Sequence, residues 1–339
     1  MKKALQYIIP IAVAALVVWF ILKNVDPAKI WENIQAADPF WVIVIVVVTL
    51  LSHLSRAYRW KLLMQPIGYN PSLRNTFIAV MTGYFGNVFI PRGGEVMRSG
   101  VLSRTDNIPF SSSFATVIAE RVFDLLCLLT LIGASFLFEY DRFMLLLKKK
   151  SEFQSSQPVE SASSNLIWWV LIGLILIAIL AVIIFRKKIK ELNVVAKVKK
   201  FVIDLFSSAF NSFRQLKNKK EFILHTFLIW LGYYLMTYLA FFCLPATAGL
   251  SPAAGLVMLV VGGLGMSVPS SGGIGPFHYF VATAMLLFYG IAQEPSIAYA
   301  AILHAVPFIT VVMVGGICVI TSFYIKPKDS AIKKPEDSL

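Results

Sequence analysis

Two stretches of sequence, GYFGNVFIPRGGE at residues 83–95 and GGLGMSVPSSGGIG at residues 262–275, share one layout: an apolar half-helix, a proline and a pair of glycines. The apolar runs that lead into them, near 77–90 and 255–268, are each about 14 residues long. Such a run is too short to cross the hydrocarbon core of a bilayer comfortably. Because proline and paired glycines then interrupt the helix, both stretches predict the half-helices of re-entrant hairpins.

The composition of the whole chain indicates an integral membrane protein. Hydrophobic residues make up 58% of the 339 residues and charged residues only 14%, whereas a soluble domain has ~25% charged residues. We therefore predict an all-α, polytopic integral membrane protein with about six full spans and two oppositely oriented re-entrant helical hairpins in an inverted repeat. An arrangement in which the second hairpin crosses the membrane twice fits the charge pattern equally well. The predicted spans cover residues 5–22, 40–55, 111–138, 166–185, 222–244 and 297–324.

The distribution of charge favours a cytoplasmic position for both termini. Lys and Arg number 31 against 18 Asp and Glu, which gives a net charge of +13, and the excess is concentrated in residues 56–109 and 186–220. These basic segments alternate with nearly neutral ones, as cytoplasmic loops do, so membrane orientation explains the charge better than a nucleic-acid partner. Three predicted spans separate the two hairpins, which are therefore expected to enter from opposite faces.

A single transmembrane domain is expected over residues 1–325, followed by a short cytoplasmic tail at 326–339. Within this domain, residues 190–217 place apolar side chains at helical spacing opposite a row of lysines. This pattern indicates an amphipathic helix that lies in the cytoplasmic membrane surface. A solvated basic helix that links two spans is the alternative.

Three charged residues, Glu120, Arg121 and Asp124, fall inside the predicted span 111–138. At 1.5 Å per residue, Glu120 lies roughly 14 Å from the start of that span, near the middle of the membrane. Ionised groups at such a depth cost several kcal/mol unless they are paired or hydrated. We expect them to line a polar cavity and to pair with Arg92 or Arg98; a salt-bridge clamp between hairpin and helix is a compatible alternative.

The glycine pairs are suited to two roles. Gly93, Gly94, Gly272 and Gly273 permit tight backbone turns, and a helix that begins after such a turn offers free backbone NH groups to an anion. Alternatively, these glycines allow the helices to pack closely.

The histidines and cysteines offer little sign of chemistry. His278, beside the second break, is suited either to binding phosphate or to helix packing, and we interpret His53, His225 and His304 as hydrogen-bonded packing residues. The cysteines lack metal-ligand spacing, and no motif typical of a catalytic or nucleotide-binding site occurs. The sequence therefore predicts a protein that is not an enzyme and uses no cofactor or metal.

The ordered motifs Gly86-Asn87, Pro91-x-Gly93-Gly94-Glu95-x-x-Arg98, Glu120-Arg121-x-x-Asp124 and Pro269-x-x-Gly272-Gly273-Ile274-Gly275 carry a family resemblance. In these motifs the chain resembles the flippase-like transmembrane domain of the lysylphosphatidylglycerol synthase family, here without the synthase domain. The resemblance implies a domain of the prokaryotic cytoplasmic (inner) membrane that moves modified phospholipids between leaflets, often beside or fused to a lipid-modifying enzyme. Many relatives have an acidic residue three positions after the last glycine, where this chain has His278.

The function we predict is membrane lipid translocation, in which the head group of an anionic phospholipid or polyprenyl-linked lipid passes between leaflets through a polar cavity. A membrane partner that does not transport, but anchors or regulates a separately encoded glycosyltransferase or lipid-modifying enzyme, is the alternative; an integral-membrane lipid enzyme with Glu120 or Asp124 as a base is a third. The sequence leaves the oligomeric state open. The predicted substrate-binding residues are Asn87, Arg92, Gly93, Gly94, Glu95, Arg98, Glu120, Arg121, Asp124, Pro269, Ser270, Ser271, Gly272, Gly273, Gly275 and His278.

Overall fold

The computed structural model describes residues 26–90, 93–145, 200–268 except 201, 202, 204, 205 and 208, and 270–326. The predicted spans at 5–22 and 166–185, the first half of the amphipathic helix and the predicted tail after residue 326 lie outside the described residues. Within these described ranges the regular structure is entirely helical, which confirms the all-α prediction.

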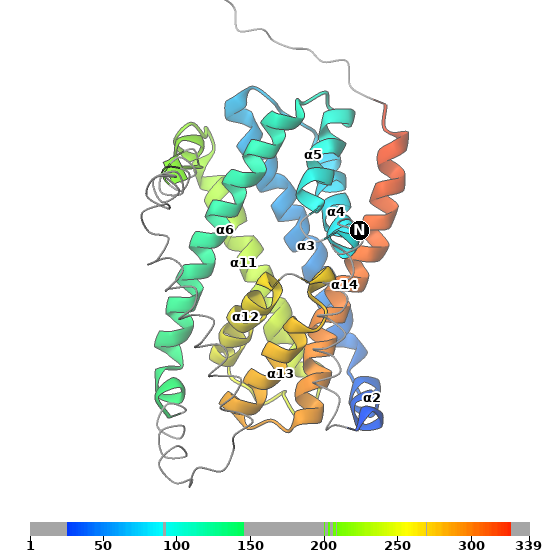
Figure 1. Ribbon diagram of the computed structural model, residues 1–339, viewed down its shortest axis with the longest axis vertical. Helices are drawn as coiled ribbons and strands as arrows, with labels where there is room; N and C mark the ends of the chain where they lie inside the picture. Colours follow the sequence, from blue (N-terminus) through cyan, green and yellow to red (C-terminus); the bar gives the residue numbers. More distant parts are fainter. Residues whose placement is uncertain are drawn as a thin grey trace, which may run out of the picture.

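Helices α2 and α3 open the described chain, and two helical hairpins, α4–α5 and α12–α13, alternate with the longer helices (Figure 1). The elements are α2 Pro27–Gln35, α3 Pro39–Met64, η1 Gln65–Ile67, α4 Leu73–Phe89, α5 Gly94–Thr105, α6 Phe110–Phe138, α11 Lys219–Leu239, η2 Ala240–Cys243, α12 Pro252–Ser267, η3 Ser271–Gly273, α13 Pro276–Tyr289 and α14 Gln293–Tyr324.

Four helical segments of the described chain are long and apolar enough to cross a membrane: Pro39–Ile67, Phe110–Phe138, Lys219–Cys243 and Gln293–Tyr324. They correspond to four of the six predicted spans. The predicted end of the first of them, at residue 55, was wrong, because α3 continues to Met64. Arg56 and Arg59, which we assigned to a cytoplasmic loop, are buried side chains within this helix.

The hairpins enter the bundle from opposite ends (Figure 1). Helices α4 and α12, with 17 and 16 residues, are each roughly 25 Å long. Both begin at a serine N-cap, since Ser72 Oγ accepts from Asn75 N and Ser251 Oγ accepts from Ala254 N, each at 3.2 Å. Helices α4 and α12 both end in the middle of the molecule, and α5 and α13 lead back to the end at which each hairpin began.

Glycines let the two helices of each hairpin approach closely. A Cβ atom on Gly94 would overlap the carbonyl of Gly83, and one on Gly265 would lie 2.8 Å from Phe277 Cα. The close-packing interpretation is therefore correct for these positions. The tight-turn interpretation holds for the second hairpin, where Gly272 and Gly273 have φ values of 62° and 80°.

The first hairpin turns differently from our expectation. Gly93 has a φ of −69°, an ordinary right-handed value that any residue adopts. The space that a side chain at Gly93 would occupy is nevertheless crowded, because a Cβ atom there would lie 2.8 Å from Ile90 Cγ2. The Gly93–Gly94 pair therefore serves close packing at the turn and not a left-handed backbone conformation.

We expect Gly94→Ala to lower the thermal unfolding temperature of the detergent-solubilised protein, since the added methyl group would meet the backbone of α4. Overpacking of this kind costs about 1–3 kcal/mol or more. Gly100→Ala is the matched control on the same helix, because a Cβ atom at Gly100 meets no atom within 4 Å; replacing an exposed helical glycine is stabilising by up to ~1 kcal/mol. Equal unfolding temperatures for the two variants would contradict the packing argument.

Candidate functional site

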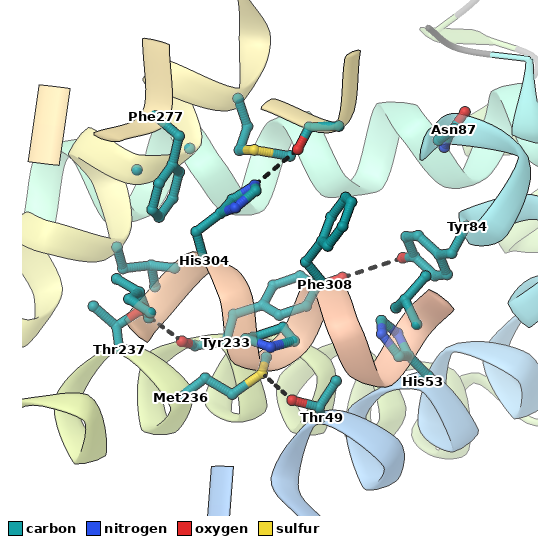
Figure 2. Close-up of a pocket in the computed structure, with 18 of the residues that line it drawn as sticks. Thr49, His53, Tyr84, Asn87, Tyr233, Met236, Thr237, Phe277, His304 and Phe308 are labelled. Carbon is teal, nitrogen blue, oxygen red and sulfur yellow. Dashed lines mark hydrogen bonds between the residues drawn. The ribbon is translucent and has the colours of Figure 1, made fainter. Parts of the chain in front are cut away.

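A cavity of about 510 Å³ lies between the two hairpins. In Figure 2, Tyr84, Asn87 and His53 lie on one side of it and His304 and Phe277 on the other, with Phe308 between them. Most of the wall is apolar, as is usual for ligand sites of this size. Its polar or charged lining residues are Thr49, His53, Arg56, Tyr84, Asn87, Arg121, Asp124, Trp230, Tyr233, Thr237 and His304.

Beside the cavity, three arginines surround the fully buried carboxylate of Glu120 on α6. Glu120 Oε1 accepts from Arg56 Nη1 at 2.7 Å and from Arg59 Nη2 at 3.0 Å, and both arginines come from α3. Glu120 Oε2 accepts from Arg98 Nη2 of α5. A single carboxylate therefore joins three helices.

Asp124, one helical turn further along α6, extends the same network. Its two carboxylate oxygens accept from Arg56 at 2.9 Å and from Arg59 at 2.7 Å. The side chains of Arg56 and Arg59 are 2% and 0% exposed, so both arginines depend on these carboxylates for charge compensation. Arg98 also lies over the Trp60 ring, with Cζ 4.2 Å from the ring centroid, which adds a cation–π contact.

The buried cluster carries an excess of positive charge. Three guanidinium groups face the two carboxylates of Glu120 and Asp124, so the net charge is +1. Arg121 and Glu95 continue the network towards the cavity and add one charge of each sign. Arg121 Nη1 lies 3.3 Å from Asp124 Oδ2, Arg121 Nε lies 3.9 Å from Glu95 Oε1, and the arginine side chain remains 43% exposed. Its guanidinium therefore has donors available to a bound anion.

The structure brings most of the predicted residues of the first hairpin and α6 together. The predicted Arg98–Glu120 pair is present, whereas Arg92 lies outside the described residues. Asn87 lines the cavity, but its Oδ1 accepts from Gly94 N at 2.8 Å. The expectation that this NH is free for an anion was therefore wrong.

Among the predicted residues of the second hairpin that the structure describes, Gly272 alone lines the cavity. Its carbonyl accepts from His304 Nε2 at 2.8 Å. Ser270 Oγ donates to Val268 O at 3.4 Å within the turn, and Gly273 and Gly275 shape the backbone with positive φ. Pro269 and the side chain of Ser271 lie outside what the structure describes.

His278, in the first turn of α13, is not among the cavity-lining residues. Its ring centroid lies 4.8 Å from that of His304, which does line the cavity. We predicted a hydrogen-bonded packing role for His304, and the hydrogen bond is present. The expected hydrogen bond was wrong for His53 and His225, because the buried Nδ1 atom of each has no hydrogen-bond partner. The expected packing is present at His53, whose ring lies against Tyr84 with centroids 4.4 Å apart.

Sequence reasoning missed the α3–α11 wall of the cavity. Thr49, His53 and Arg56 occur at positions i, i+4 and i+7 of α3 and line one face, a spacing that would have indicated a polar stripe had the helix been extended beyond residue 55. On α11, Tyr233 accepts from Arg56 Nη2 at 2.8 Å. The Trp230 ring packs against Tyr233, and its buried Nε1 has no hydrogen-bond partner.

In the described part of the chain, four helical segments long and apolar enough to cross a membrane, two opposed helical hairpins and an ionic cluster beside a cavity define an integral membrane protein of the polytopic helical class. Within that class, the chain belongs to the family described as the lysylphosphatidylglycerol synthase TM region, which matches residues 7–315. This confirms the resemblance seen in the sequence motifs.

Three individual relatives share between 28% and 32% sequence identity with this chain over the matched segments. A UPF0104 membrane protein of Methanocaldococcus jannaschii is 28% identical over 207 residues, which cover 60% of this chain and 56% of that protein. A UPF0104 membrane protein of Methanothermobacter thermautotrophicus is 29% identical over 153 residues, 43% of this chain and 45% of its own. The glycosyltransferase AglD of Haloferax volcanii is 32% identical over 110 residues, 32% of this chain and 18% of that protein. The chain thus spans about half the length of the two UPF0104 proteins and a smaller part of AglD.

We expect Glu120→Gln to destabilise the detergent-solubilised protein strongly, because it leaves three buried guanidinium groups facing one carboxylate. Breaking a buried ion pair by removing one partner costs about 3–5 kcal/mol. Glu32→Gln is the control for loss of one negative charge, since Glu32 is exposed on α2. Thermal unfolding measured side by side checks this, and comparable unfolding temperatures would mean that the cluster does not hold the helices together.

Proposed function

We propose that this protein moves a phosphate-bearing lipid between the two leaflets of the membrane, with the head group in the cavity and the acyl or prenyl chains in the bilayer. The observation that carries the proposal is the position of Arg121, which lines the cavity with an incompletely paired guanidinium next to a cluster of net positive charge. Guanidinium groups bind phosphate through charged, often bidentate hydrogen bonds.

The physical task of such a protein is to shelter a polar group from hydrocarbon. A phosphate that enters the bilayer core without partners bears a desolvation cost far above that of a neutral polar group. A cavity that offers a guanidinium, tyrosine hydroxyls and backbone groups lowers this cost while the apolar chains stay outside. The mixed wall of the cavity, apolar with a cationic side, suits the junction between a lipid head group and its chains.

In this proposal both hairpins are re-entrant and enter from opposite membrane faces, as two halves of an inverted repeat, and the N- and C-termini lie in the cytoplasm. The opposed directions of the two hairpins in Figure 1 and the short first helix of each, α4 and α12, support this arrangement. Gly272, in the non-helical turn of the second hairpin, lines the cavity, and irregular backbone is tolerated within a membrane where it lines such a cavity. The proposed membrane is the cytoplasmic membrane of a prokaryote, and the relatives support that location.

A second candidate is a non-transporting membrane partner of a separately encoded glycosyltransferase or lipid-modifying enzyme. The similarity to a part of AglD, a protein named as a glycosyltransferase, favours it. In that case the cavity would bind a lipid and present it to the enzyme without moving it across the membrane.

Purified protein in liposomes with fluorescent phosphatidylglycerol tests the proposal, because quenching by dithionite from outside reports lipid in the outer leaflet. We expect Arg121→Gln to slow lipid movement about tenfold or more, since a hydrogen bond to a charged group contributes about 1.5–3 kcal/mol. Arg74→Gln is the control on the first hairpin, because Arg74 is exposed at the start of α4. Lipid movement by the parent protein no faster than in empty liposomes would instead favour the partner role.

A further inference from the structure

His304 lies on the side of the cavity opposite Tyr84 (Figure 2), where it forms a pair with His278 beside the tip of the second hairpin. His304 comes from α14 and lines the cavity, and His278 comes from the first turn of α13. Their ring centroids are 4.8 Å apart at an interplanar angle of 61°. Neither the ionic cluster nor the proposed role of Arg121 makes use of this pair.

The hydrogen bonds of the pair leave places for an added proton. The carbonyl of Gly272 only accepts, so His304 Nε2 must donate to it across 2.8 Å, and this leaves His304 Nδ1 as the basic nitrogen of the neutral ring. His278 Nδ1 is buried and has no hydrogen-bond partner. Each ring therefore has a nitrogen whose protonation would not break a bond present in the structure.

No acidic side chain stands near enough to compensate an imidazolium among the described residues. Helix α12 and η3 contain no ionisable residue, and α13 contributes only Tyr279 and Tyr289 besides His278. On α14 the one carboxylate is that of Glu294, ten residues and about 15 Å before His304. The ionisable groups that face the cavity from other helices are His53, Arg56, Tyr84, Arg121, Asp124 and Tyr233.

Among the described residues, one carboxylate faces the cavity, that of Asp124, and it is already engaged because it accepts from Arg56, Arg59 and Arg121. A proton on either histidine therefore creates a positive charge without a fixed counterion in mostly apolar surroundings, which is unfavourable. The first turn of α13, where His278 lies, carries the positive end of the helix dipole and disfavours the cation further. An anion bound in the cavity beside His304 supplies the missing counterion, and it also offsets the positive end of the α13 dipole.

We infer that the His278–His304 pair is a second head-group site, at which the phosphate diester of a lipid binds together with a proton. This inference rests on the proposed function and adds a second phosphate position to the path, on the second hairpin, to complement Arg121 near the first. In this site His304 contacts the phosphate directly. His278, which does not line the cavity, packs against the His304 ring and shares the added positive charge. Binding of lipid and binding of proton then strengthen each other reciprocally.

The test measures the affinity of the detergent-solubilised full chain for fluorescent phosphatidylglycerol between pH 5.5 and 8, a range in which this phosphodiester keeps one charge. We expect binding to tighten as the pH falls, by up to about tenfold per pH unit if one proton is taken up per lipid. Titration calorimetry in two buffers of different ionisation enthalpy measures that uptake directly. Diacylglycerol with the same fluorophore lacks the phosphate and should show no pH dependence.

Two variants assign the proton to the pair. His304→Gln retains an NH donor for the Gly272 carbonyl and His278→Gln retains polarity, and both should flatten the pH dependence. His225→Gln is the control, since His225 packs against Tyr58, with ring centroids 4.4 Å apart, and does not line the cavity. It should keep the parent's pH dependence. Gel filtration checks that each variant is folded, and the proton uptake of the parent needs no substitution.

The outcomes separate this inference from the proposed function. Absence of proton uptake by the parent, a parent slope retained in both pair variants, or equal slopes for the two lipids would overturn the inference. If phosphatidylglycerol still binds and moves, and Arg121→Gln still impairs it, the proposed function stands without the second site. Failure of the parent to bind phosphatidylglycerol at every pH would overturn both.

Discussion

The carboxylate of Glu120, shared by Arg56, Arg59 and Arg98, is the interaction on which the first half of the structure depends. Charged groups leave water only at a high cost, which is offset when good geometry brings opposite charges together. Helices α3, α5 and α6 can therefore bury these groups only in an arrangement that lets all of them meet. That arrangement fixes the first hairpin and forms the cationic side of the cavity.

The second hairpin is held by different means. Its helices close on each other through Gly262 and Gly265 against Phe277, and its tip is joined to α14 by the hydrogen bond between His304 and the Gly272 carbonyl. Two hairpins of similar layout thus present contrasting chemistry to one cavity, an ion-paired side and a nearly uncharged side. A lipid with a phosphate head group has matching polar and apolar parts.

The sequence predicts the helix breaks that form the two helical hairpins, and the charges of α6, because both are local signals. Proline and paired glycines interrupt apolar runs, and Glu120 and Asp124 stand out within an apolar segment. The end of α3 was missed because Arg56 and Arg59 have the charge typical of loop residues, and the partner that allows their burial, Glu120, lies more than 60 residues later in the chain. Likewise, the role of His304 depends on its contacts with Gly272 and His278, which helical spacing alone does not reveal.

Photo-crosslinking tests most directly whether the cavity holds the head group. Phosphatidylglycerol with a diazirine on its head group is bound to the protein and irradiated, and the labelled residues are identified by mass spectrometry. We expect labels on the cavity face of α3, at Thr49 and His53, and near His304 of α14. Labels confined to the outward-facing residues of α3, such as Ile43, Val47 and Leu51, would contradict a head-group path between the hairpins.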